Sequence, residues 1–173
     1  MKIVSRDLLH KSDVGGVRVG PRTEAEVREA YAGIEAAVTL RAPQAQREGL
    51  MVARKLTPRL ELMMGARYDP TFGTVIVLGR GGVAVELEAR TALSLAPCRP
   101  ERVREQLERL GLLRHLAAFR GQPAVAIQPL IDLVVRFSEL AAGLGESLVT
   151  MEINPLMVTE EGVFAADAVI ELR

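Results

Sequence analysis

The chain has 173 residues, and its 22 basic and 22 acidic side chains cancel to a formal net charge of zero. This length corresponds to about one domain, or to a domain with two lobes, and can bury a core without disulfides or structural metals. Balanced charge, 3% aromatic residues and no tryptophan argue against a nucleic-acid partner and against a surface that attracts anionic membranes.

The lone cysteine, Cys98, excludes an internal disulfide framework and a cysteine-based zinc site, and we expect a small buried or loop thiol there. No apolar run approaches the roughly 20 residues of a membrane span, and the first residues lack the apolar segment of a signal peptide. We therefore expect a cytoplasmic protein without a membrane partner.

The N-terminal part is predicted to hold one strand and one helix. Residues 2–5 form a short apolar strand, and residues 6–22 form a loop. Thr23 followed three residues later by Glu26 has the form of a capping box, which predicts a helix that runs to about Leu40. Residues 41–49 return as a loop.

The rest of the chain is predicted to contain strands grouped around two further helices. Apolar runs bounded by Pro- or Gly-containing turns predict strands at residues 50–56, 60–67, 74–78 and 83–88. Helices are predicted from Pro100 to Leu110 and from about Ala124 to Ala142, with Gly143 and Gly145 ending the second. The tail alternates over residues 148–153, 156–159 and 163–170. Strands with helices before, between and after them indicate an α/β or α+β fold.

The tail is predicted to form a hairpin that brings metal ligands together. If Glu161-Gly162 is the turn, Asn154, the only asparagine, faces Val169 and lies diagonally from Asp167. If the turn lies one residue earlier, Asn154 faces Asp167 directly. Glu152 shares the face of Asn154 in either register. These hard oxygen ligands suit Mg²⁺ bound together with nucleotide phosphates, and Asp167 in an apolar stretch is expected to be buried and to need a partner.

The first loop combines a nucleophile with groups suited to phosphate. His10 can act as a nucleophile toward phosphorus, and Lys11 can supply a point charge. The pair Gly15-Gly16 allows this loop to flex or to approach a ligand closely.

A second glycine-rich turn, Gly79-Arg80-Gly81-Gly82, follows an apolar strand. Its backbone N–H groups, those of Gly81 and Gly82 above all, can bind an anion. It lacks the Gly-Lys-Ser/Thr of a Walker loop, and an ordinary hairpin turn is the alternative interpretation.

Together these segments resemble the ATP-grasp subunit, or domain, of NDP-forming acyl-CoA synthetases, the family of ADP-forming acetate–CoA ligase and kin of succinyl-CoA synthetase β subunits. The resemblance covers nearly the whole chain and rests on four motifs in the family's order. They are KIVSRDLLHKSDVGGV from Lys2, ELMMGARYDPTFG from Glu61, GRGG from Gly79, and EINPL from Glu152 with Asp167 downstream.

The resemblance implies an ATP-grasp fold and a role for each motif. Lys2 matches a lysine that contacts nucleotide phosphate, and His10 matches a histidine that exchanges a phosphoryl group with a partner's phosphohistidine. Asn154 and Asp167 match the Mg²⁺ ligands. The candidate site residues are therefore His10 as the catalytic residue, Lys2, Lys11, Val52, Glu61, Gly81 and Gly82 for ATP or ADP, and Asn154, Asp167 and Glu152 for Mg²⁺.

The resemblance also implies a partner and two lobes. The overall family reaction is acyl-CoA + ADP + phosphate ⇌ acid + CoA + ATP, and the CoA and acyl half normally lies on a CoA-binding subunit or domain. Residues 1–48 correspond to an incomplete small lobe with a mobile histidine loop, and residues 49–173 to the large lobe. Val52 lies where the family places its adenine-binding hinge, although Ala53-Arg54-Lys55 and Tyr68 depart from the usual pattern.

Such chains normally carry a further segment before the first lysine. The alternatives are therefore a degenerate, non-catalytic module for subunit association, or a fragment of a longer protein whose start lies upstream of Met1. A homo-oligomer is also possible for either form.

Overall fold

The computed structural model describes residues 1–8, 10–82 and 90–173, and it divides the chain into two compact units, Met1–Lys55 and Leu56–Arg173. The sequence suggested a boundary after residue 48. The structure places it after Lys55, because the strand that follows residue 48 pairs with the first strand of the chain.

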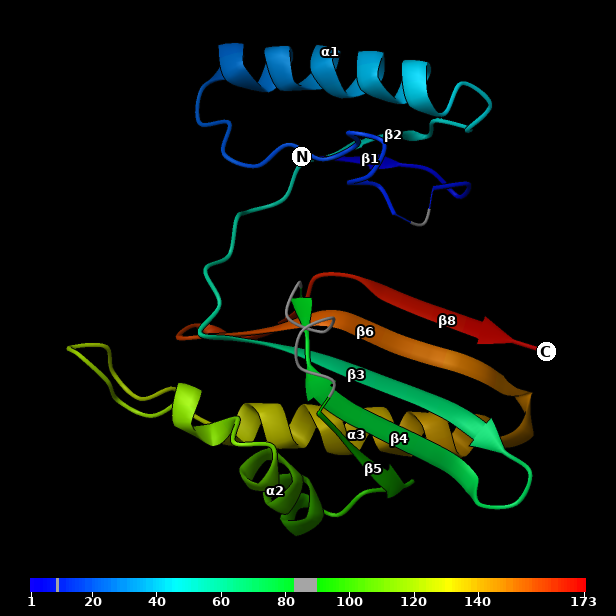
Figure 1. The fold of residues 1–173 in the computed structure, drawn as a ribbon, viewed down its shortest axis with the longest axis vertical. Helices are drawn as coiled ribbons and strands as arrows, with labels where there is room; N and C mark the ends of the chain where they lie inside the picture. Colours follow the sequence, from blue (N-terminus) through cyan, green and yellow to red (C-terminus); the bar gives the residue numbers. More distant parts are fainter. Residues whose placement is uncertain (9, 83–89) are drawn as a thin grey trace. The chain divides into compact units, whose positions relative to one another are not determined.

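Unit 1 is a helix on a two-stranded sheet (Figure 1). Strand β1 (Lys2–Val4) pairs antiparallel with β2 (Gly49–Met51), and helix α1 (Glu24–Arg41) packs its buried Ile34 and Val38 against Ile3. The predicted Thr23 N-cap is confirmed, since its hydroxyl accepts a hydrogen bond from the Glu26 N–H at 3.2 Å. The reciprocal bond of a capping box is shifted by one residue, because the Glu26 carboxylate accepts the Arg22 N–H at 2.6 Å.

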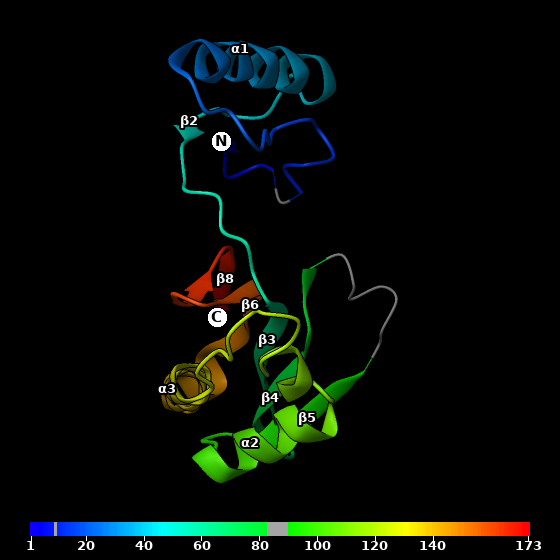
Figure 2. The same ribbon diagram turned by 90° about the vertical axis from the view of Figure 1, so that its left-hand side faces the viewer.

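Unit 2 is an antiparallel sheet covered on one face by helices, as Figures 1 and 2 show. The strands lie in the order β5-β4-β3-β6-β7, and β8 also pairs with β6. The strands are β3 (Leu60–Asp69), β4 (Gly73–Arg80), β5 (Thr91–Leu95), β6 (Leu148–Thr159), β7 (Gly162–Ala165) and β8 (Ala168–Leu172). The helices are α2 (Pro100–Arg109) and α3 (Gln128–Leu144), with short 3₁₀ turns η2 (Leu113–His115) and η3 (Gly145–Ser147).

The core of unit 2 lies between the helices and one face of the sheet. On β3, Leu60, Leu62, Met64 and Ala66 are buried there, and the two helices contribute apolar side chains opposite them. Because side chains alternate along a strand, Glu61, Met63 and Gly65 lie on the opposite face, which we call the outer face.

A β-bulge interrupts the pairing of β3 with β6. Leu62 pairs with Leu156 and Met64 pairs with Ile153, so Asn154 and Pro155 together oppose Met63. The extra residue shifts the alternation of β6, and both Ile153 and Leu156 contact the core although they are three positions apart.

Several predicted boundaries were wrong for identifiable reasons. β2 is shorter than predicted, and β5 was missed because small Ala92 and Ser94 face inward while Leu93 and Leu95 are exposed. Helix α3 begins at Gln128, next to a proline in its first turn. In the tail, β6 is one continuous strand where two were predicted, at residues 148–153 and 156–159. The predicted strand at residues 163–170 is instead divided into β7 and β8. The predicted strand 83–88 lies outside the described residues.

Among the described residues, no helix combines the length and apolar character needed to cross a bilayer. Cys98 is buried, as expected.

Candidate nucleotide and metal site

Strand β6 places Asn154 beside Asp167. The β6–β7 hairpin turns at Glu160-Glu161, with Thr159 paired to Gly162, so the second of the two predicted registers is confirmed. In this register the Asn154 N–H donates to the Asp167 carbonyl oxygen at 3.2 Å. Asn154 on β6 therefore directly faces Asp167, which lies between β7 and β8.

Asp167 is exposed, so the prediction of a buried carboxylate was wrong. The residue lies in the two-residue break between β7 and β8, where the edge of the sheet is interrupted opposite the bulge of β6. One of its carboxylate oxygens, Oδ1, accepts a hydrogen bond from the Ala168 N–H at 3.1 Å. The hydrogen bond from the next residue orients the Asp167 carboxylate, and its exposure leaves it accessible to a ligand.

Two further acidic residues lie on the outer face near Asn154. Glu152 precedes it by two positions on β6 and pairs with Gly65 of β3. Glu61 also projects from β3 on the outer face, and both are partly buried. These carboxylates make this part of the outer face negative, which disfavours a bare phosphate and favours one that arrives with a cation.

The glycine turn at the end of β4, residues 79–82, reaches across β3 to Asn154 on β6. Gly81 continues the β4 ladder by donating its N–H to the Glu61 carbonyl at 2.9 Å, and the Gly82 N–H donates to Asn154 Oδ1 at 3.3 Å. Both N–H groups that were expected to bind an anion thus have protein acceptors in this arrangement.

The remaining predicted site residues belong to unit 1. Lys2 lies on β1, opposite Met51 and next to Val17. Val52 follows β2 outside any strand, and the residue is 66% exposed. This unit therefore carries the lysine and the hinge segment that the sequence motifs single out.

His10 is exposed on a loop whose base is tightly packed. Backbone hydrogen bonds join Asp13 to His10 at 3.2 Å and Gly16 to the Lys11 carbonyl at 2.8 Å. A Cβ on Gly16 would lie 2.6 Å from Ile3 Cγ2. The glycine pair is predicted to allow the loop to flex or to approach a ligand closely, and in the structure Gly16 permits close packing against β1.

Sequence reasoning missed two contacts that hold the first part of this loop. Arg6 Nε lies 3.0 Å from Glu48 Oε1, and Asp7 Oδ2 accepts the Gln46 N–H at 2.7 Å. Both contacts join residues about forty positions apart, so no local pattern signals them.

The Tyr68 hydroxyl donates a hydrogen bond to Glu146 Oε1 at 3.2 Å. Partial burial, together with the negative charge of Glu146, raises the pKa of the Tyr68 hydroxyl above its usual value of 10.0. Tyr68 lies at the far end of β3 from Glu61, so it does not join the acidic group around Asn154.

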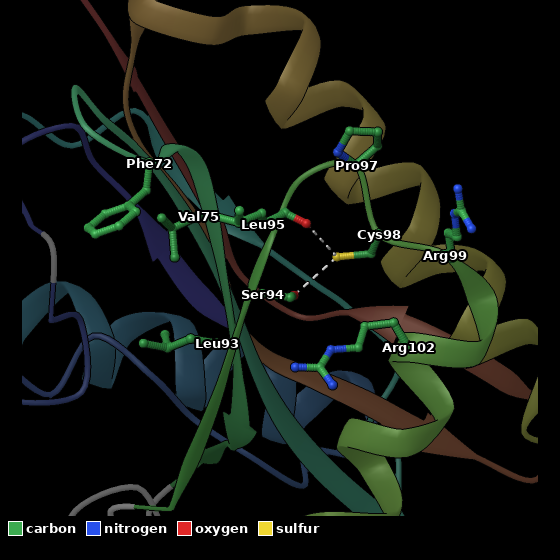
Figure 3. A pocket seen from close by; sticks show the side chains of 9 residues that line it. All are labelled: Phe72, Val75, Leu93, Ser94, Leu95, Pro97, Cys98, Arg99 and Arg102. Carbon is green, nitrogen blue, oxygen red and sulfur yellow. Dashed lines mark hydrogen bonds between the residues drawn. The ribbon is translucent and has the colours of Figure 1, made fainter.

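A hollow of about 650 Å³ lies beside β5 and is shown in Figure 3. Phe72, Val75, Leu93 and Leu95 give it an apolar wall, and Arg99 and Arg102 line it from the α2 end. None of the predicted site residues lines it. It is a separate feature from the outer-face site.

The oxygens of Asn154 and Asp167 in unit 2 fit a hard cation whose other ligands come from phosphate and water. Within residues 1–8, 10–82 and 90–173, no three His, Cys, Asp or Glu side chains converge on a possible metal position. An amide oxygen and a carboxylate, with phosphate and water oxygens to complete the shell, are what Mg²⁺ takes in nucleotide sites.

Comparison with known proteins confirms the family that the sequence motifs resemble. The ATP-grasp domain family matches residues 1–172. The β subunit of ADP-forming acetate–CoA ligase I from Pyrococcus furiosus is 34% identical over 168 residues, which are 97% of this chain and 72% of that subunit.

Two solved structures of dinucleotide-forming acetyl-coenzyme A synthetase 1 from Candidatus Korarchaeum cryptofilum share the fold. One, with coenzyme A, Ca-AMPCP and HgCl⁺, has a TM-score of 0.89 and 36% identity, over 99% of this chain and 75% of that one. The other, with coenzyme A and Mg-AMPPCP, has a TM-score of 0.77 and 32% identity, over 100% and 75% of the chains, and its phosphohistidine segment points towards the nucleotide binding site. The present chain therefore belongs to the ATP-grasp domain family, in the group that serves ADP-forming acyl-CoA synthetases.

Proposed function

We propose that this chain binds ADP or ATP with Mg²⁺ and transfers a phosphoryl group between the nucleotide and His10, as the nucleotide-handling part of an ADP-forming acyl-CoA synthetase. The observation that carries the proposal is the register of the hairpin, in which Asn154 and Asp167 face each other directly. The solved relative with Mg-AMPPCP supports the choice of ligand.

Asn154 Oδ1 and the Asp167 carboxylate would hold the cation, and Glu152 lies on the same face to contribute a water-mediated contact. Bound Mg²⁺ would neutralise phosphate oxygens and so lower the barrier to phosphoryl transfer. Glu61 and Glu152 repel a phosphate that arrives without a cation, so nucleotide and metal are expected to bind together.

His10 would act as the nucleophile. In its neutral form, one ring nitrogen attacks the γ-phosphorus of ATP, the N–P bond forms, and the bond to the bridging oxygen breaks to release ADP. The reverse transfer makes ATP from ADP and phosphohistidine. The exposed position of His10, on a loop held at its base by Gly16, supports this role.

A CoA-binding subunit or domain would supply the acyl half of the reaction. The Pyrococcus relative is named as a β subunit, and the Korarchaeum structures contain coenzyme A. Lys2 and Lys11 would contact phosphate, and Val52 would lie along the adenine.

Calorimetry with ADP, with and without Mg²⁺, tests the binding part of this proposal. Asn154→Ala or Asp167→Ala is expected to weaken Mg²⁺-dependent binding at least about tenfold, equivalent to about 1.4 kcal/mol, because each variant removes one metal ligand. Glu171→Ala removes an exposed carboxylate from β8 and serves as the matched control. Equal affinity in all three variants would contradict the metal site.

Incubation with ATP labelled at the γ-phosphate tests the transfer. Acid-labile, base-stable label is expected in the parent chain and in His115→Ala, and is expected to disappear in His10→Ala. Label that persists in His10→Ala would contradict the assignment. Nucleotide binding without any label, also after addition of the CoA-binding partner, would support the non-catalytic module instead.

A further inference from the structure

We propose that Gly82 is a positioning residue for the metal site, whose backbone N–H fixes the orientation of the Asn154 side-chain amide. The inference rests on the proposed function, because it takes Asn154 as a ligand of the cation. It assigns the second glycine of the Gly81-Gly82 pair a task other than binding phosphate.

The path of the chain after β4 brings this N–H to Asn154. Gly81 is still bonded to β3 through the Glu61 carbonyl, at 2.9 Å. One residue later, Gly82 has φ +66° and donates its N–H to Asn154 Oδ1 on β6, at 3.3 Å. The turn therefore crosses the outer face of β3 and joins residues that are 72 positions apart in sequence.

This crossing is only possible without side chains. A Cβ on Gly81 would overlap the backbone carbonyl of Leu62, which belongs to the ladder of β3 and cannot move aside. A Cβ on Gly82 would overlap the Glu61 carboxylate, and the positive φ of Gly82 disfavours any side chain. The two glycines are needed because the turn lies directly on β3.

The chemistry of an amide explains why the contact matters. Asn has one oxygen that binds a hard cation and one NH₂ group that cannot, and a 180° flip exchanges them with little change in shape. A backbone N–H can pair only with the oxygen, so Gly82 selects the orientation in which Oδ1 lies at its end of the side chain. The oxygen has a second lone pair, which remains available to the cation.

A double-mutant cycle separates this role from a merely structural one. The probe is Mn²⁺ with ADP, with free Mn²⁺ followed by electron paramagnetic resonance in Gly82→Ala, Asn154→Asp and the double variant. Gly82→Ala is expected to weaken Mn²⁺·ADP binding at least tenfold when residue 154 is Asn, and less than threefold when it is Asp. A carboxylate has two equivalent oxygens, so its orientation needs no selection.

Equal losses in the two backgrounds would overturn the proposal. Gly73→Ala is the matched control, because Gly73 also has a positive φ, +78°, but has open space around it. If Gly82→Ala does not fold, the same cycle is run with Glu61→Ala added throughout, which removes the carboxylate that the new Cβ would overlap.

A second measurement does not depend on the metal. Asn154 is the only asparagine, so ¹⁵N-asparagine labelling gives the pair of signals of a single side-chain amide. Its ¹⁵N relaxation is expected to show an ordered amide in the parent chain and in Gly73→Ala, and a mobile one in Gly82→Ala. An amide equally ordered in all three would overturn the positioning role. Absence of Mn²⁺·ADP binding in the parent chain would refute the proposed function and leave this measurement intact.

Discussion

Arg59 joins the start of β3 to the segment between α2 and α3, and its replacement is expected to destabilise unit 2. Its guanidinium donates to the carbonyls of Pro123 at 3.0 Å, Ala117 at 3.0 Å and His115 at 3.4 Å. It also lies 3.5 Å from Glu160 Oε1, with 12% of the Arg59 side chain exposed and 52% of the Glu160 side chain.

The carbonyl contacts of Arg59 are expected to contribute more to the free energy of unfolding than its ion pair with Glu160. Hydrogen bonds from a charged donor contribute about 1.5–3 kcal/mol each, and bonds from one side chain are not additive. With two bonds at 3.0 Å, Arg59→Met is expected to lower the free energy of unfolding by about 3 kcal/mol. The pair with exposed Glu160 is worth much less, so Glu160→Gln is expected to cost about 0.5 kcal/mol or less.

The variant Arg59→Lys separates the effect of the positive charge from that of the planar guanidinium. An ammonium keeps the charge but cannot reach separate carbonyls as a planar guanidinium does, so about half of the loss is expected. Urea unfolding of the full chain, followed by circular dichroism, measures all three variants. A Lys variant as stable as the parent, or a Glu160→Gln loss as large as that of Arg59→Met, would refute this explanation.

Two further predictions concern side chains away from the site. In a Tyr31→Phe background, alkaline absorbance titration is expected to place the Tyr68 pKa above 10.0, and Glu146→Gln to lower it; a midpoint at or below 10.0 would contradict the assigned environment. Because the folded pKa is raised, the stability that Tyr68 contributes is present below pH 10 and is lost as the pH rises through the folded pKa. Ser138→Ala is expected to cost about 1–3 kcal/mol in urea unfolding, because the buried Ser138 hydroxyl accepts the Cys98 N–H at 2.8 Å, and an unchanged midpoint would show that this N–H finds another acceptor.

Local signals in the sequence were enough to predict the helices and the hairpin. The Thr23 cap and Pro100 at a helix start are residues whose preferences act within one turn, and helices appear at both places. The register that joins Asn154 to Asp167 was one of two left open, since a shift of one residue in the turn decides between them.

Features that depend on distant parts of the chain were not predictable. β5 carries its large apolar residues outward, so Leu93 and Leu95 give no sign of which face is buried. Likewise, nothing near Gly82 in the sequence indicates that its N–H meets Asn154, because that contact requires β3 to lie between them.

The bulge opposite Met63 also has an evolutionary consequence. Deleting one residue of the pair Asn154-Pro155 would leave Ile153 and Leu156 two positions apart, so both would still face the core and keep their partners Met64 and Leu62. A deletion of Asn154 would therefore remove the proposed metal ligand and leave the register of β6 intact on either side. Descendants of this chain can lose the ligand by deletion as well as by substitution, whereas a single deletion elsewhere within β6 would turn part of the strand over.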